Sequence, residues 1–336
     1  MKERETDSRA ERVKNAMLHR GRDRVRSMML DVIVALVPAL GVSTYFFGPR
    51  VLLLAIVSVA GSAAFEALYC FLVKKKQTWK DGSAMVTGLL LVMTLPATAP
   101  YWMVLLGDLF AIVIVKNLYG GLGRNFLNPA LAGRVFLFSF PALMSRWTAS
   151  GEWTGIFSAA DAVTTATPMT AMRAGKLPGV NLQELLLGQR AGALGETAAL
   201  MLILGGVYLL LRRTIKLRIP VAFLGTAAVL SLIFNRGNDP VQWMLYSLLS
   251  GGMLMAALFM ATDPVTSPVT PAGQWLYGIG CGVMTVFLRR CGAWHEGVGF
   301  AILFMNLWAW ILDKIVRPRA ARAARRSRDK SGKEGL

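Results

Sequence analysis

Runs of apolar residues that approach the length of a bilayer crossing constrain this chain more than any other feature. A membrane-spanning helix needs about twenty predominantly apolar residues to cross the hydrocarbon layer. The 336-residue chain is 54% hydrophobic with a mean hydropathy of +0.49, and a single soluble core would not need so many apolar runs. The chain is therefore predicted to be a membrane protein, with its longest runs at Asp31–Phe47, Val51–Val73, Tyr101–Val115, Leu194–Leu211 and Phe300–Val316.

About ten such segments can be placed, which predicts an all-α polytopic membrane protein. Ten divides into two groups of five, and because five is odd the second group would enter the membrane from the opposite side, as in inverted repeats. In each half an apolar segment leads into a break, at Asn128-Pro129 and at Ser267-Pro268. The predicted fold is two inverted five-helix repeats, with segments at Met28–Phe47, Val51–Val73, Ser83–Thr98, Tyr101–Lys116, Ala130–Met144, Ala193–Leu211, Ile219–Phe234, Val241–Met260, Pro271–Leu288 and Gly297–Val316.

The positive charge of the chain indicates its orientation in the membrane. The net charge is +18, and the basic residues crowd beside the apolar runs, at Arg20–Arg26, Lys74–Lys80, Arg212–Arg218 and Arg317–Arg328. Such clusters mark cytoplasmic loops and tails, so they favour a topology signal over nucleic-acid binding. Ten crossings place both termini in the cytoplasm and residues 145–190 outside, with Arg289 and Arg290 as the exception that would face outward.

The same pattern divides the chain into five parts. Residues 1–26 are predicted to be a cytoplasmic tail, 27–144 the first membrane repeat, 145–190 an extracytoplasmic loop, 191–316 the second repeat, and 317–336 a basic cytoplasmic tail that contacts anionic membrane lipid. The three cysteines have no metal-ligand spacing and the two histidines lie outside the apolar runs, which argues against an iron–sulfur cluster or haem held by this chain's side chains alone.

One short motif in the external loop carries chemical information. It reads Asp161-Ala162-Val163-Thr164-Thr165-Ala166-Thr167-Pro168. By local physics alone, Thr167 followed by Pro168 is a good helix start, with the threonine as N-cap and the proline at the first helical position. A helix cap is therefore the structural interpretation of this motif.

The motif and its context also resemble a known family. Asp-x-x-Thr-x-Ala-Thr looks like the site at which a periplasmic FMN transferase esterifies the phosphate of FMN, taken from FAD, onto the last threonine. The chain from about Ser27 to Val316 resembles the RnfD family of Rnf complex subunits and, more distantly, NqrB of the sodium-translocating NADH:quinone oxidoreductase. Its other landmarks are Asp81–Gly88, Leu95-Pro96 with Pro100 and Trp102, Gly123–Ala130, Gly192–Thr197 and Thr262–Pro268.

This resemblance implies a role for the motif and for the whole chain. Thr167 would carry covalent FMN, with Asp161, Thr164 and Ala166 as the attachment motif, and Thr165 stands where the family commonly has a small residue. The chain would be a membrane subunit of a ferredoxin:NAD⁺ oxidoreductase that moves Na⁺ or H⁺. Its partners would be a second covalent FMN subunit, iron–sulfur membrane subunits and a cytoplasmic NADH-binding subunit. By analogy with the more distant relative, riboflavin is a further expected cofactor.

Three acids are candidates for an ion path. Glu66 and Asp108 lie inside apolar runs, where a carboxylate is costly to bury in the membrane. A functional role is therefore the default hypothesis for both. Their structural alternative is a buried partner for Lys116 or Arg124, and Asp263 in the second break has the alternative of capping a turn. A rival function is a channel or secondary transporter without redox chemistry, which would have no use for the Thr167 motif.

Overall fold

The computed structural model describes residues 2–75, 77–153, 155–156, 165–197, 199–237, 239–292 and 297–316, with only the backbone for 2–22. All regular structure in these ranges is helical. The helices are α1 (Lys2–Phe47), α2 (Arg50–Leu72), η1 (Trp79–Asp81), α3 (Ser83–Met93), α4 (Tyr101–Leu109), η2 (Phe110–Asn117), α5 (Pro129–Leu137), α6 (Pro141–Met144), α7 (Pro168–Arg173), α8 (Leu182–Leu187), α9 (Ala199–Leu211), α10 (Arg218–Ile233), α11 (Pro240–Leu249), α12 (Met253–Met255), η3 (Ala256–Met260), α13 (Pro271–Cys291) and α14 (Val298–Val316).

Three of the described helices are long and apolar enough to cross a membrane. They are the Asp23–Phe47 part of α1, all of α2, and α14. A fourth candidate is the pair Pro240–Leu249 and Met253–Met260, which bends by 63° at a short break. Helices α3, α9 and α10 are apolar but shorter. The chain is thus an all-helical protein with several apolar spans, as predicted.

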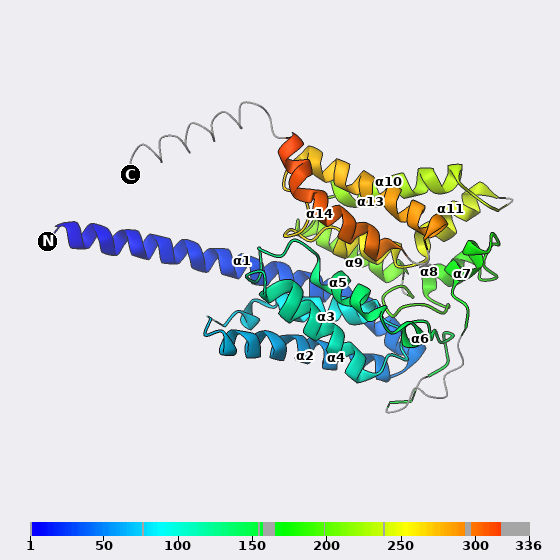
Figure 1. The fold of residues 1–336 in the computed structure, drawn as a ribbon, viewed down its shortest axis with the longest axis horizontal. Helices are drawn as coiled ribbons and strands as arrows, with labels where there is room; N and C mark the ends of the chain where they lie inside the picture. The colour runs from blue at the N-terminus through cyan, green and yellow to red at the C-terminus, as the bar shows by residue number, and fades with distance from the viewer. Residues whose placement is uncertain are drawn as a thin grey trace.

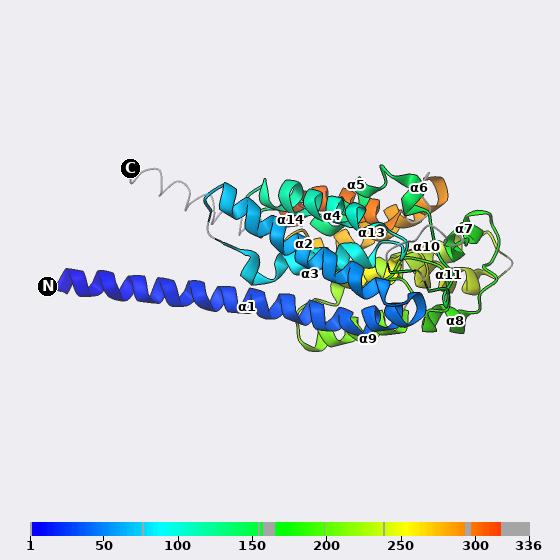
Figure 2. The same cartoon turned by 90° about the horizontal axis from the view of Figure 1, so that it is seen from below.

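The two halves of the chain lie side by side, and helices of one half contact helices of the other (Figure 1). Helices α2 to α5 of the first half pack on one another, and α10, α11, α13 and α14 form a second group. Helix α1 packs along α9, which both views show, and α5 contacts α14 (Figures 1 and 2). Gly205 makes the α1–α9 approach close, because a Cβ there would meet the backbone of Ala35. Small residues have this role in membrane helix packing.

The centre of the molecule contains two non-helical segments that bond to each other. Helix α3 is almost wholly buried and ends at Met93, before the break that contains Pro96. The backbone N–H groups of Leu194 and Gly195 donate to the carbonyls of Leu95 and Met93. Backbone without helical bonds is tolerated at membrane depth only where it is buried in protein or lines a cavity. These mutual bonds therefore allow both breaks to lie in the core.

Both halves contain a π-helix that leads into a break and then into a proline-started helix. In the first half η2 is followed by the turn that ends in Asn128-Pro129, and in the second η3 is followed by the turn that ends in Thr270-Pro271. Asn128 and Thr270 each cap the following helix through a side-chain oxygen. The Asn128 amide also donates to the carbonyl of Met260, the last residue of η3, at 3.2 Å. π-Helical turns occur frequently at functional sites.

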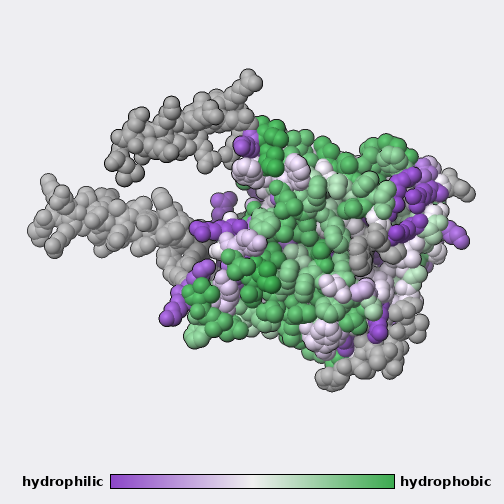
Figure 3. All heavy atoms as spheres, viewed as in Figure 1, coloured by the Kyte–Doolittle hydropathy of each residue, from purple (hydrophilic) through white to green (hydrophobic). Residues whose placement is uncertain are grey.

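The surface separates into an apolar flank and two polar ends (Figure 3). Helix α14 ends on the side from which α1 extends, whereas α6, α7 and α8 lie at the other end (Figure 1). Residues Arg212 and Thr214 belong to the former end, because their side chains donate to Asp31 of α1. We call the two the terminal end and the α7 end. Exposed large apolar side chains of the long helices include Phe71 of α2, Leu211 of α9 and Trp310 of α14, as expected for a protein in contact with lipid.

Each predicted segment overlaps a helix, but several boundaries differ. The segment predicted to end at Thr98 contains a helix that ends at Met93, and the segment predicted from Ala193 contains a helix from Ala199. The segment Ala130–Met144 is divided into α5, which ends at Leu137, and the short α6, which ends at Met144. Helix α1 runs unbroken through the predicted boundary between residues 26 and 27. The shortened helices are those next to the paired breaks and the turns, where apolar sequence continues after the helix has ended.

Candidate functional site

The predicted attachment residue Thr167 lies at the α7 end, immediately before α7. It occupies the N-cap position in extended backbone (φ −74°, ψ 155°), and Pro168 follows at the first helical position. Its side chain makes no capping hydrogen bond; instead its hydroxyl lies 3.0 Å from that of Thr170, at an exposed site. The backbone geometry is that of a helix start, but the Thr167 hydroxyl does not accept a capping hydrogen bond from α7. Thr167 as a residue is half-buried, with this hydroxyl contact on its exposed side.

The rest of the motif is described only in part. Asp161 and Thr164 lie outside the described residues, and Ala166 is exposed. Thr165 is bound more firmly than Thr167, since its backbone N–H and its hydroxyl donate to the Trp147 carbonyl at 2.8 and 3.3 Å. Of the two described motif threonines, Thr167 has its hydroxyl contact at an exposed site, whereas that of Thr165 is part-buried. A phosphoester at Thr167 would not disturb the Thr165–Trp147 bonds, so the described residues fit an attached FMN.

Glu66 takes part in a buried ion pair at the α2–η2 contact. The Lys116 ammonium lies 3.0 and 3.1 Å from the two Glu66 carboxylate oxygens, and both side chains are almost wholly buried. Thr78 donates to Glu66 at 2.7 Å, and Lys116 donates to the Ser83 hydroxyl at 2.6 Å. Both charges are therefore partnered inside the first half, which matches the structural alternative for Glu66.

Asp108 on α4 is buried without such a partner. Ser58 and Ser62 of α2 each donate to the same carboxylate oxygen at 3.0 Å. The second oxygen has no hydrogen-bond partner among the described residues, and the residue is fully buried. Ser58, Ser62 and Glu66 follow one another at intervals of four residues, which places them on one face of α2. A polar seam thus runs along α2 from Asp108 to the Glu66–Lys116 pair.

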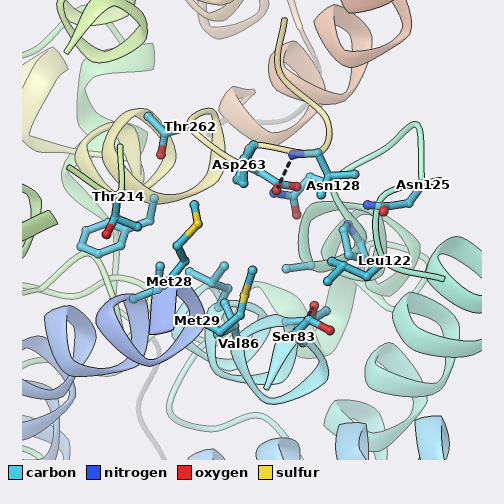
Figure 4. Close-up of a pocket in the computed structure, with 18 of the residues that line it drawn as sticks. Met28, Met29, Ser83, Val86, Leu122, Asn125, Asn128, Thr214, Thr262 and Asp263 are labelled. Atoms are coloured by element: carbon cyan, nitrogen blue, oxygen red, sulfur yellow. Dashed lines mark hydrogen bonds between the residues drawn. The ribbon is translucent and has the colours of Figure 1, made fainter. Parts of the chain in front are cut away.

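Asp263 lies where the loops of the two halves meet. Its carboxylate accepts from the Val265 N–H and the Thr266 hydroxyl, both at 3.1 Å, so it caps the turn after η3. It also lines a pocket of ≈ 760 Å³, part of it open to solvent (Figure 4). The wall is mainly apolar, with convergent polar groups from both halves, as in sites for organic ligands. Those labelled in Figure 4 include Ser83, Asn125, Asn128, Thr262 and Asp263.

A buried group of charges that the sequence does not reveal by itself lies on the α7 side of the centre. Glu196 interacts electrostatically with Arg134, Arg190 and Arg289, which come from α5, the loop before α9, and α13. Arg190 donates to the Glu196 carbonyl and to the Ser250 hydroxyl. The sequence predicts that this apolar segment starts at Ala193, but α9 begins only at Ala199, so Glu196 precedes the helix. An arginine inside the apolar run of α5 is the signal that points to this group.

Comparison with known proteins now identifies the family. Residues 12–322 match the model of the NQR2, RnfD, RnfE family. The chain belongs to this family. It is 41% identical over 303 residues to the D subunit of the Na⁺-translocating ferredoxin:NAD⁺ oxidoreductase complex of Acetobacterium woodii, covering 89% of this chain and 92% of that protein.

Other members of the NQR2, RnfD, RnfE family are similar over the same extent. The D subunit of the proton-translocating ferredoxin:NAD⁺ oxidoreductase complex of Clostridium ljungdahlii is 37% identical over 309 residues (88% of this chain, 91% of that protein). The D subunit of the ion-translocating oxidoreductase complex of Stutzerimonas stutzeri is 36% identical over 327 residues (89% and 92%). The Acetobacterium woodii protein is named for Na⁺ and the Clostridium ljungdahlii protein for protons, so similarity does not determine the ion. Family membership and the apolar helices identify the chain as a multi-pass membrane subunit of an oxidoreductase complex.

Proposed function

We infer that this chain is the membrane flavoprotein subunit of an Rnf-type ferredoxin:NAD⁺ oxidoreductase that couples electron transfer to translocation of Na⁺ or H⁺. The observation that carries the proposal is Thr167. It ends an Asp-x-x-Thr-x-Ala-Thr motif in a member of the NQR2, RnfD, RnfE family, and its hydroxyl is exposed. A channel or transporter without redox chemistry, the rival function, gives no reason for this motif.

The residues around Thr167 suit a tethered cofactor. The Thr167 hydroxyl would form the phosphoester with FMN, whose ring system supplies reversible electron transfer when bound. The ester leaves that ring free, so protein charges and hydrogen bonds near the ring set its potential. Two residues before Thr167, Thr165 is bonded to Trp147, and Pro168 starts α7 directly after it. These contacts hold the attachment point in place.

Flavin fluorescence of the denatured chain tests the attachment. Coexpression of the full chain with an FMN transferase should give a fluorescent band after denaturing electrophoresis, and Thr167→Ala should abolish it. Thr170→Ala is the matched control, because it removes the neighbouring hydroxyl and leaves the acceptor; its band should remain, as should that of Thr165→Ala. A band that persists in Thr167→Ala would exclude this attachment site.

The proposed topology has ten crossings in two inverted halves, with both termini in the cytoplasm. Two observations support it. The terminal end and the α7 end lie at opposite ends of the apolar flank, and each half has a π-helix, a break and a proline-started helix in the same order. Thr167 then lies outside, where the transferase works. This is the orientation that the basic clusters predict.

For the ion path we propose Asp108, with Glu66 and Asp263 along the way to the terminal end. Asp108 has hydroxyl neighbours, and one of its oxygens has no hydrogen-bond partner among the described residues. A carboxylate with such surroundings can bind a proton or a cation, whereas the charge of Glu66 is already balanced by Lys116. The polar seam on α2 reaches Glu66 beside Thr78, and the pocket that Asp263 lines includes Thr214 of the terminal end.

The pocket between the halves is the proposed site for riboflavin. Its apolar wall carries a few amide and hydroxyl groups that can fix the polar edge of a ring. Asn125, Asn128, Thr262 and Ser83 would hold this second flavin without a covalent bond. The remaining proposed partners are a second FMN subunit, iron–sulfur membrane subunits, an NADH-binding subunit, the FMN transferase and membrane lipid.

A further inference from the structure

The hydroxyl groups around Asp108 carry too few protons for the contacts that they make. Ser58 Oγ lies 3.0 Å from an Asp108 carboxyl oxygen and 2.8 Å from the Gly88 carbonyl oxygen. Ser62 Oγ lies 3.0 Å from the same carboxyl oxygen. A serine hydroxyl carries a single proton, so two serines can donate only twice. If Asp108 were ionised, one of these three contacts would bring two oxygens together without a proton between them.

A proton on the Asp108 carboxyl group completes the arrangement. The carboxyl O–H then donates to Ser58, Ser58 donates to the Gly88 carbonyl, and Ser62 donates to the Asp108 oxygen. A protonated carboxyl group provides one donor and keeps its capacity to accept. The other Asp108 oxygen has no hydrogen-bond partner among the described residues. In the neutral acid this oxygen carries no net charge, so its burial costs far less than that of a carboxylate.

No cationic side chain balances a negative charge at Asp108 in the part of the chain that the structure describes. The helices packed against α4 are α2, α3, α5 and η2, and α3 has no ionisable residue. A buried carboxylate is stable only when it is paired, so the neutral form is favoured. The four charged residues of these helices all have other partners: Arg50 donates to backbone carbonyls, Glu66 pairs with Lys116, and Arg134 interacts with Glu196.

The backbone around Asp108 favours a proton over Na⁺ as the bound ion. Ser58, Ser62, Gly88 and Asp108 all lie within helices, whose carbonyls are used by helical hydrogen bonds. Membrane transporters typically coordinate Na⁺ with carbonyls of unwound helix. Helices α2 and α3 also approach closely, because a Cβ at Gly88 would lie 2.6 Å from Ser62 Oγ and 2.7 Å from the Ser58 carbonyl oxygen. This packed helical contact offers few additional ligands for a metal cation.

We propose that Asp108 is protonated in the absence of electron transfer, and that the ion bound at this site is a proton rather than Na⁺. This rests on the proposed function, which places Asp108 on the ion path. Binding forms one O–H bond on the carboxyl group, and release breaks it without any change in oxidation state. The released proton passes on through the hydroxyl of Ser62, the next group of the polar seam. The structure thereby specifies an ion that the similarity to relatives leaves open.

Infrared difference spectroscopy of the full chain in detergent at neutral pH tests the protonation. The parent minus Asp108→Asn spectrum should contain the C=O stretching band of one protonated carboxyl group per chain. Ser58→Ala should move this band to higher frequency, because the carboxyl O–H loses its acceptor. The matched control is Asp31→Asn, since Asp31 is a buried carboxylate that lies 3.1 Å from the Arg212 guanidinium; it should leave the band unchanged. A parent without the band, or a band that persists in Asp108→Asn, overturns the proposal.

Sodium and transport measurements separate this proposal from the proposed function. Replacing choline chloride by sodium chloride should leave the band of the parent at full intensity, and its loss in Na⁺ would show that Na⁺ displaces the proton. In proteoliposomes of the complete complex, electron transfer should move protons in Na⁺-free buffer, with fewer per electron in Asp108→Asn. Equal proton transport in parent and variant, with the band present in the parent, would refute the ion path through Asp108 while its protonation stands.

Discussion

The two ends of the molecule are both basic, but their cations are used differently. At the terminal end Lys74 and Lys75, directly after α2, and Lys80 of η1 are exposed. At the α7 end Arg50 is 2% exposed and donates to four backbone carbonyls, of Ala97, Ala99, Gly155 and Ile156. Arg289 is fixed by carbonyls in the same way.

This difference shows why counting charges gives the topology only approximately. Lysines beside helix ends interact with water and lipid headgroups, so their position reports the side of the membrane. An arginine whose guanidinium is bound to carbonyls inside the protein reports a local structural requirement instead. Arg289 and Arg290 are an exception to the charge pattern, and the structure provides the reason, because both are engaged with backbone carbonyls.

The largest expected effect concerns the sides on which the two ends lie. In a chain without the three native cysteines, Glu152→Cys at the α7 end should react fully with an impermeant thiol reagent added to intact cells. Lys75→Cys at the terminal end should react only after lysis. Both positions are exposed, so accessibility within the protein does not limit the reaction. Labelling in the reverse order would refute the orientation and the external position of Thr167.

The next effect lies between the two ends, in the buried pair Glu66–Lys116. Glu66→Gln leaves a buried ammonium without its carboxylate, which should destabilise the protein by about 3–5 kcal/mol. Thermal unfolding in detergent would show this as a lower transition temperature. The double variant Glu66→Gln, Lys116→Met is the control and should recover much of the loss. If the single variant were as stable as the parent, the pair would not be structural.

Arg50 provides the corresponding test at the α7 end. Arg50→Met removes a guanidinium that joins the break after α3 to the residues at 155–156, and buried carbonyls lose their donor. The expected cost is about 3 kcal/mol, because each hydrogen bond to a charged group contributes about 1.5–3 kcal/mol and relaxation recovers part. Lys75→Met at the terminal end is the matched removal of a cation and should alter stability by less than about 0.5 kcal/mol. Equal effects at the two positions would remove the distinction between the ends.

Asp108→Asn should have the smallest effect on stability and a selective effect on transport. The amide keeps the shape and can still accept from Ser58 and Ser62, so assembly and flavin content should be normal. It cannot bind a proton or balance a cation equally well, so the ratio of ions moved to electrons transferred should fall in proteoliposomes. An unchanged ratio would remove Asp108 from the ion path.

The sequence predicts the positions of the helices well because apolar runs reflect the membrane directly. It fails at the ends of α3 and α9, since the sequence there stays apolar or small while the backbone leaves the helix. What ends these helices is a long-range pairing, from Leu194 to Leu95 and from Gly195 to Met93, which no local pattern reports. The same holds for the candidate sites. Thr167 could be predicted from a contiguous motif, whereas the buried group around Glu196 combines arginines from α5, the loop before α9 and α13 and could not.

The contacts between helices of the two halves have a consequence for biogenesis. Helix α1 needs α9 as a neighbour, and α5 needs α14, which is the last described helix to be synthesised. While the ribosome is still producing the second half, the break after α3 has no partner for the backbone groups that later bond to residues 194 and 195. The first five segments can therefore insert into the bilayer early, but their core can be completed only after the C-terminal helix has left the translocon. A nascent chain truncated after residue 190 should accordingly remain a substrate for membrane quality-control proteases.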